Sequence, residues 1–263
     1  MTVRLAATEY GSEQSDPPPL AILHGLFGSG RNWASIAQRL AAHRRVVCFD
    51  LRNHGASGWA GGMQYGEMAE DVLAMLDERG WRRAALLGHS MGGKAAMAAA
   101  LRDPDMVERL VVVDVAPVAY PPRHLDLVRA MRALDLTGIK RRAEADQLLA
   151  PAIPDTGERG FLLQNLMFED GQARWRLNLE AIERAMPVLV GFPALPDNAV
   201  YRGPALFIAG GHSDYLRPEH EPAIRRLFPE ARFERVENAG HWVHAEQPAA
   251  FLGIVEPFLA AAV

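Results

Sequence analysis

The chain has 263 residues, 49% of them hydrophobic and 23% charged, with a formal net charge of −4 at pH 7. This is the composition of a globular protein, and it offers no basic surface for nucleic acid. No apolar run approaches the roughly 18 residues of a membrane span, and residues 1–19 contain no apolar stretch of signal-peptide length. Cys48 is the single cysteine, so no internal disulfide can form. We expect a cytoplasmic protein in which this thiol is buried.

Four short apolar segments in the first half of the chain predict β-strands. Their apolar residues are consecutive rather than alternating, which is typical of strands covered by helices on both faces. Helical segments separate them, and this repeated order indicates a mostly parallel, doubly wound α/β sheet. The expected strands are 20–23, 45–49, 84–87 and 110–113, and the expected helices are 32–43, 68–79 and 91–102.

The alternation of strands and helices stops near Pro117 and resumes after Gly203. Residues 117–203 show helical periodicity and proline-rich joints but no convincing strand, so we predict a helical cap, or lid, inserted into a core of residues 1–116 and 204–263. The expected cap helices are 125–134, 141–149, 161–168 and 177–186. The core is expected to continue with strands at 205–209 and 232–236 and a closing helix at 248–262.

The segment Gly88-His89-Ser90-Met91-Gly92 matches Gly-x-Ser-x-Gly between a predicted strand and a predicted helix. This is the nucleophile motif of the α/β-hydrolase fold. A sharp strand-to-helix turn strains the backbone at the serine, and glycines on both sides let neighbouring backbone segments pass close by. We therefore predict that Ser90 is a nucleophile held above the edge of the sheet.

A glycine-rich turn, His24-Gly25-Leu26-Phe27-Gly28, follows the first expected strand. Such a turn can aim a backbone N–H at the reacting oxygen, and the N–H after the nucleophile supplies a second donor. We assign these oxyanion donors to Leu26 and Met91 and expect Phe27 to contact substrate. His24 is interpreted as a structural brace for the loop.

The base is predicted to be His241, in the loop Gly240–Glu246 after the last expected strand, and Trp242 beside it is expected to line the pocket. A histidine suits this task because its pKa is near neutrality. Two carboxylates could orient it. Asp114 ends the strand before the cap and Asp214 follows the strand after it, and spacing alone does not separate them.

Five motifs stand out along the chain, at residues 24–29, 50–57, 88–94, 113–118 and 239–246. Together they resemble the YbfF-like esterase branch of the α/β-hydrolases, and the resemblance extends from about residue 20 to the end. It implies a cofactor-free carboxylic-ester hydrolase with a helical lid, acting on acyl esters, with acyl-CoA thioesters as a further class. No metal is expected either, because the histidines and carboxylates show no metal-ligand spacing such as His-Glu-x-x-His. The resemblance also favours Asp114 as the acid. The sequence departs from the pattern by having a carboxylate at Asp214 too, so Asp214 is the alternative.

The predicted partner is a small-molecule ester or thioester. Arg123, with His124, follows a Pro-Pro joint and is a candidate contact for a polar or anionic leaving group. Apolar cap residues are candidates for an acyl pocket: Leu125, Met131, Phe161, Leu166, Met167, Phe168 and Trp175.

The same triad would also serve a C–C bond hydrolase, a lactonase or a cofactor-free perhydrolase, and a non-hydrolytic small-molecule receptor is a remote alternative. Structural roles are expected for Arg52, Asn53, His54 and Lys94.

Overall fold

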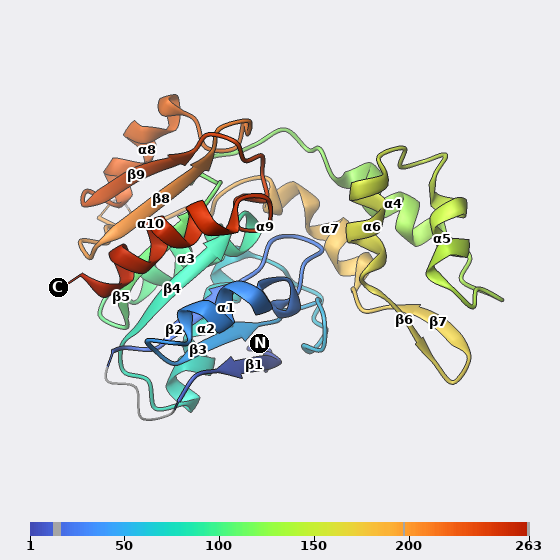
Figure 1. Ribbon diagram of the computed structural model, residues 1–263, viewed down its shortest axis with the longest axis horizontal. Helices are drawn as coiled ribbons and strands as arrows, with labels where there is room; N and C mark the ends of the chain where they lie inside the picture. The colour runs from blue at the N-terminus through green and yellow to red at the C-terminus, as the bar shows by residue number, and fades with distance from the viewer. Residues whose placement is uncertain (13–16, 197, 262–263) are drawn as a thin grey trace.

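The computed structural model describes residues 1–12, 17–196 and 198–261. Its centre is a seven-stranded sheet in the order β1-β3-β2-β4-β5-β8-β9 (Figure 1). The edge strand β1 pairs antiparallel with β3, and the other described pairings in this sheet are parallel. The strands are β1 (Ala7–Tyr10), β2 (Leu20–Leu23), β3 (Val46–Phe49), β4 (Ala84–His89), β5 (Val107–Val113), β8 (Ala205–Gly210) and β9 (Ala231–Val236).

Helices cover both faces of this sheet, which explains the consecutive apolar residues of its strands. In β2, Leu20 and Ile22 pack in one apolar cluster with α1 and α10, whereas Ala21 and Leu23 pack in the opposite cluster with α2 and α3. The mostly parallel, doubly wound sheet predicted from the sequence is confirmed. The core helices are α1 (Ala34–Leu40), α2 (Tyr65–Glu78), α3 (Met91–Arg102), α8 (Glu221–Leu227), α9 (Val243–Glu246) and α10 (Pro248–Ala260), with 3-10 turns η1 (Gly30–Trp33) and η2 (Pro218–His220).

The strand β1 was not expected from the sequence. Three of its four residues are exposed and the fourth is half-buried, so it carries no apolar run. An edge strand needs only one neighbour for its backbone, and its side chains can stay in water.

Cys48 is buried as expected, and burial raises the pKa of its thiol to about 12. The last residue of the expected closing helix, Ala262, lies outside the described residues.

The cap, residues 117–203, adds no strand to the central sheet over its described length. Its helices and a small hairpin lie together beyond one end of the sheet (Figure 1). They are α4 (Leu125–Ala133), α5 (Arg142–Leu149), α6 (Thr156–Leu163), α7 (Leu179–Leu189), β6 (Leu166–Glu169) and β7 (Gln172–Trp175). No helix among the residues described is both long and apolar enough to cross a membrane.

The expected cap helix at 161–168 is wrong, and so is the expectation of a cap without strands. The helix α6 ends at Leu163, and β6 then pairs antiparallel with β7. The turn between them is Asp170-Gly171, with φ angles of 49° and 74°. An Asp-Gly pair accepts positive φ at both turn positions, which fits the twist of a two-residue hairpin. The apolar run before the turn suggests a helix, and helical periodicity does not detect the turn itself.

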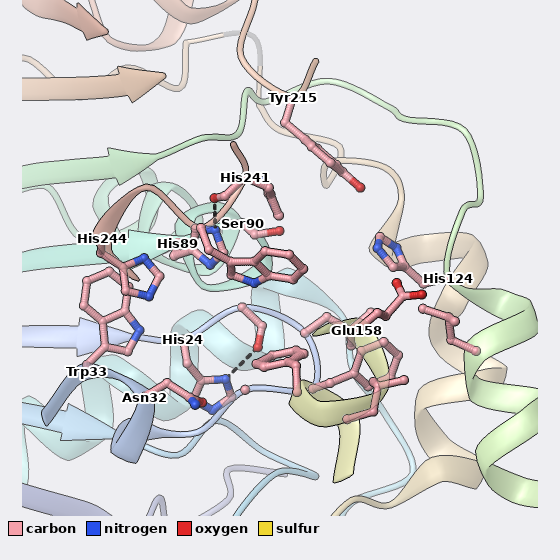
Figure 2. Close-up of a pocket in the computed structure, with 18 residues that line it drawn as sticks. His24, Asn32, Trp33, His89, Ser90, His124, Glu158, Tyr215, His241 and His244 are labelled. Carbon is pink, nitrogen blue, oxygen red and sulfur yellow. Dashed lines mark hydrogen bonds between the residues drawn. The ribbon is translucent and has the colours of Figure 1, made fainter. Parts of the chain in front are cut away.

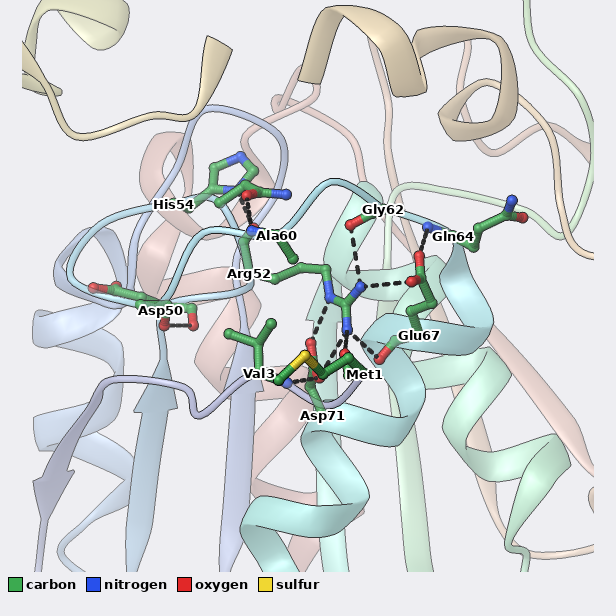
Figure 3. A network of polar contacts seen from close by, with 12 residues as sticks. Met1, Val3, Asp50, Arg52, His54, Ala60, Gly62, Gln64, Glu67 and Asp71 are labelled. Carbon is green, nitrogen blue, oxygen red and sulfur yellow. Dashed lines mark hydrogen bonds and ion pairs between the residues drawn. The ribbon is translucent and has the colours of Figure 1, made fainter. Parts of the chain in front are cut away.

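The turn after β3 is held by a buried ion pair (Figure 3). The Arg52 guanidinium donates to both carboxylate oxygens of Asp71 on α2, at 2.6 and 2.9 Å. Both side chains are almost completely buried. Next to Arg52, the His54 ring donates to the main-chain oxygen of Arg52 and accepts from the amide of Phe27. The turn thus supports the loop that carries Leu26.

Candidate active site

Ser90 lies at the sharp turn between β4 and α3 and has φ 53° and ψ −117°. A non-glycine residue in this region is strained, and such strain persists only where the surroundings impose it. The neighbouring glycines explain how the turn fits. A Cβ on Gly88 would lie 2.2 Å from the Gly92 oxygen, and a Cβ on Gly92 would lie 2.4 Å from the Leu23 oxygen. The turn therefore requires glycine on both sides of Ser90.

The loop after β2 is fixed by two buried histidines. His24 donates from Nδ1 to the Gly25 oxygen at 2.8 Å and accepts at Nε2 from the Leu51 amide at 2.9 Å. Phe27 has φ 62° and donates its amide to His54. His24 thus occupies the bracing position expected for it. The amides of Leu26 and Met91 take part in none of the loop, turn or side-chain hydrogen bonds of the described residues. Both are free to meet a ligand oxygen.

His241 and Asp114 are brought together from loops that are 127 residues apart in the sequence. The Nδ1–H of His241 donates to Asp114 Oδ2 at 2.7 Å. Asp114 is fully buried, and it also accepts from the Gly210 amide at 3.0 Å and from the Ser213 hydroxyl. With Nδ1 as the donor, Nε2 keeps its lone pair and can accept a proton.

The alternative acid, Asp214, lies in a different environment. Its side chain is exposed, and no hydrogen bond or ion pair between described residues joins it to His241. It follows Ser213, whose hydroxyl contacts Asp114 instead. The structure therefore brings His241 to Asp114 and leaves Asp214 in solvent.

Three side chains around His241 were missed by sequence reasoning. His89, buried beneath the loop, donates from Nε2 to the His241 main-chain oxygen at 2.8 Å. Burial is the main cause that lowers its pKa well below the usual range, so it is neutral. The Tyr215 ring stacks on the His241 ring with centroids 4.2 Å apart. Ser213 fixes the Asp114 carboxylate. His89 occupies the variable position of the Gly-x-Ser-x-Gly motif, the one sequence signal that could have singled it out.

Ser90, His241 and the Leu26 loop line one cavity between the core and the cap (Figure 2). Its walls are mostly apolar, and the cap contributes side chains from α4 and α6. A second, smaller cavity also reaches Ser90, Leu26 and Met91, and it continues towards Lys94 and Met186. Two cavities that share Ser90 in their lining suit a substrate with groups on both sides of the reacting bond.

The predicted substrate contacts are only partly brought together. Phe27 and Trp242 line the first cavity, as does His124. Arg123 is exposed and lines neither cavity at Ser90. Of the cap residues proposed for an acyl pocket, Phe161 alone lines one of these two cavities. The side chains at 125, 131, 166, 167, 168 and 175 do not.

Lys94 is one turn into α3 and is buried, in keeping with a structural role. Its ammonium donates to the carbonyl oxygens of Val118, Val190 and Gly191, which lie on the two chain segments near the ends of the cap. Burial lowers its pKa to about 7. The helix that follows Ser90 is thus tied to both of these segments.

The chain belongs to the alpha/beta hydrolase fold family, whose model matches residues 18–248. It is a serine hydrolase of the esterase and lipase class, as its named relatives are. The predicted resemblance to the YbfF-like esterases is confirmed, since the chain is 36% identical over 252 residues to the esterase YbfF of Escherichia coli. That alignment covers 95% of this chain and 96% of the relative.

Two further relatives agree with this class. The sn-1-specific diacylglycerol lipase ABHD11 of Mus musculus is 42% identical over 251 residues, covering 92% of this chain and 81% of that protein. The solved structure of a marine microorganism esterase superposes with a TM-score of 0.93 at 35% identity. It covers 98% of this chain and all of that one.

Proposed function

We propose that this enzyme hydrolyses carboxylic esters through a Ser90–His241–Asp114 triad and an acyl-enzyme intermediate. The observation that carries the proposal is the 2.7 Å hydrogen bond from His241 Nδ1 to buried Asp114, beside a strained serine that lines the same cavity. This arrangement has the parts that nucleophilic acyl transfer needs: a nucleophile, a base and a group that orients the base.

In the first half of the reaction, the Ser90 oxygen attacks the acyl carbonyl while His241 Nε2 takes the hydroxyl proton. The carbonyl oxygen becomes negatively charged and is held by the amides of Leu26 and Met91. Each such donor contributes about 3 kcal/mol to stabilisation of the transition state. Asp114 stabilises the imidazolium that forms. The C–O bond then breaks, and the leaving alcohol receives the proton from His241.

In the second half, water enters and His241 removes one of its protons as the water oxygen attacks the acyl carbon. The intermediate collapses, the bond to Ser90 breaks, and the serine regains its proton from His241. The acid product leaves, and the enzyme returns to its starting state. Tyr215 stacks on the imidazole and His89 holds its backbone, so both act as positioning residues for the base.

The cap serves as a lid in this proposal, because α4 and α6 supply side chains to the cavity at Ser90. Phe27, Phe161 and Trp242 form apolar walls for the substrate. Thioesters fit the same mechanism, since a thiolate leaves more readily than an alkoxide. Location in the cytoplasm stays a prediction from the sequence.

The test is steady-state hydrolysis of p-nitrophenyl butyrate and hexanoate by the full chain and by Ser90→Ala and His241→Ala. Each substitution is expected to lower kcat by roughly 10⁴–10⁶ because the groups act as a unit. A fluorophosphonate probe should label the unmodified chain and not Ser90→Ala. Release of no more than one equivalent of p-nitrophenol per chain would instead support a receptor. A variant that keeps more than a tenth of the activity would remove that residue from the mechanism.

A further inference from the structure

A third cavity lies on the other side of α6 from the one at Ser90, and three arginines line it. Arg31 comes from η1 in the core, and Arg142 and Arg176 come from the cap. Guanidinium groups from core and cap thus converge on one hollow at their boundary. Like charges repel, so such a grouping is unfavourable unless something negative lies between them.

Two of these three guanidinium groups make no hydrogen bond or ion pair with a described residue. Among the described residues, neither the Arg31 nor the Arg176 side chain takes part in a hydrogen bond or an ion pair. Arg142 donates to the main-chain oxygens of Leu163 and Leu166, at 3.1 and 2.8 Å. Those carbonyls fix the direction of the guanidinium and leave its net charge in place. Most exposed arginines of the cap are instead paired with a carboxylate; Arg174, for example, pairs with Glu169.

The cavity contains one acidic side chain, Asp50, and its oxygens are already engaged. Oδ1 accepts from the Gly30 amide at 2.7 Å and Oδ2 accepts from the Ala56 amide at 2.8 Å. Burial, followed by the charge of Arg31, lowers the pKa of Arg176. The formal charge of the lining is three positive groups against one negative group, so the cavity is electropositive.

The arginine cavity adjoins the one at Ser90. Phe27 and Asn32 line both cavities. The Asn32 amide donates to Gln164 Oε1 at 2.8 Å, a contact between core and cap at this boundary. Phe161 of α6 faces the Ser90 cavity, while Gln164, just past the end of that helix, lines the arginine cavity. An extended leaving group could pass along this boundary from one cavity to the other.

We propose that Arg31, Arg142 and Arg176 bind a phosphate monoester carried by the leaving group of the substrate. Guanidinium groups suit phosphate because their planar N–H donors match its oxygens, often two at a time. A dianion between core and cap arginines would also draw the cap onto the core. The inference rests on the proposed ester or thioester hydrolysis and adds that the leaving group of the substrate carries a phosphate.

Such a phosphate could come from a phospholipid-type glycerol ester or from a phosphorylated thiol carrier, and paired substrates separate the two sources. One pair is 1-hexanoylglycerol and 1-hexanoylglycerol 3-phosphate. The other is S-hexanoylpantetheine and its 4′-phosphate. We expect KM to be about tenfold lower for the phosphorylated member of the pair that matches the natural source. An Arg31→Gln/Arg176→Gln double variant should lose that preference while its KM for the neutral member stays within about twofold.

Arg174→Gln is the matched control, because Arg174 is a cap arginine two residues from Arg176, is already paired with Glu169 and does not line the cavity. It should keep the preference. Because exposed charges are screened, 0.5 M NaCl should reduce the preference in the unmodified chain. Equal KM values within both pairs would overturn the proposal, and so would a preference that survives in the double variant.

Direct binding separates failure of this inference from failure of the proposed function. Calorimetry with glycerol 3-phosphate, 4′-phosphopantetheine and their unphosphorylated forms needs no turnover. Tighter binding of a phosphorylated form, lost in the double variant, would support the site even if the chain hydrolysed no ester. Hydrolysis of neutral esters without any phosphate-dependent binding would sink the site and leave the proposed function standing.

Discussion

Replacement of Asp114 by asparagine is the sharpest test of the proposed triad, because it changes one atom in a fully buried group. Asp114 accepts from three donors: the Gly210 amide, the Ser213 hydroxyl and His241 Nδ1. An asparagine can keep its oxygen on the Gly210 amide only by turning its NH₂ towards His241. Two N–H groups would then face each other unless the imidazole changed tautomer.

The magnitude follows from that change of tautomer. With its proton moved to Nε2, His241 has no lone pair left for the Ser90 hydroxyl, and the negative charge that stabilises the imidazolium is lost as well. A hydrogen bond to a charged group contributes about 1.5–3 kcal/mol by itself. The same substitution in serine proteases lowers kcat by about 10⁴. At 1.36 kcal/mol per factor of ten, that is about 5 kcal/mol of transition-state stabilisation.

We therefore expect Asp114→Asn to lower kcat for p-nitrophenyl butyrate by about 10³–10⁴ at pH 7.5, with KM changed much less. Asp214→Asn is the matched control, because it makes the same chemical change at an exposed site, and its kcat should stay within about twofold. Circular dichroism on both variants checks that they fold. The reasoning is refuted if Asp214→Asn shows the large loss, or if a folded Asp114→Asn keeps more than a tenth of the activity.

Three further predictions concern stability. Asp71→Asn should cost about 2–3 kcal/mol in urea unfolding because it removes the fully buried carboxylate that pairs with Arg52 and leaves Glu67, at 3.1 Å, as the remaining counter-charge; an unchanged midpoint would contradict this. Gly92→Ala should lower the free energy of unfolding by about 1–3 kcal/mol or more, because its Cβ would lie 2.4 Å from a main-chain oxygen of β2. Gly253→Ala is the control: there is open space around this position, so the substitution should be neutral or stabilising. Lys94 has a folded pKa of about 7, and an unfolded lysine has one of about 10.4. Between these values the unfolded chain holds the extra proton, so this group makes the chain more stable as pH rises from 7 to 10. Lys94→Met should lack that part of the rise in parallel urea titrations, and an identical pH profile for both proteins would refute it.

The sequence predicted most of the central sheet because its strands are buried on both faces. A run of consecutive apolar residues such as Leu20–Leu23 is typical of a strand with both faces covered. The same criterion could not find β1, whose residues stay largely in solvent. It also misled the interpretation of the segment at 161–168, where Asp170-Gly171 sets a hairpin that periodicity alone does not reveal.

The candidate site divides in a similar way. Ser90, His241 and the Leu26 loop could be placed from sequence because each sits in a motif with strict steric or chemical demands. Spacing could not choose between Asp114 and Asp214, since both follow strands that end at the same edge of the sheet. The distinction depends on which carboxylate the folded loops enclose, and that is a property of the tertiary structure.

The residues that sequence reasoning missed are those that act through other residues. Tyr215 lies one position from Asp214, yet its contact is with the His241 ring, and Ser213 turns its hydroxyl to Asp114 on another strand. The loop after β8 therefore supports the proposed triad through Ser213 and Tyr215, the residues on either side of Asp214. The Asp214 side chain itself is exposed and takes no part in this support.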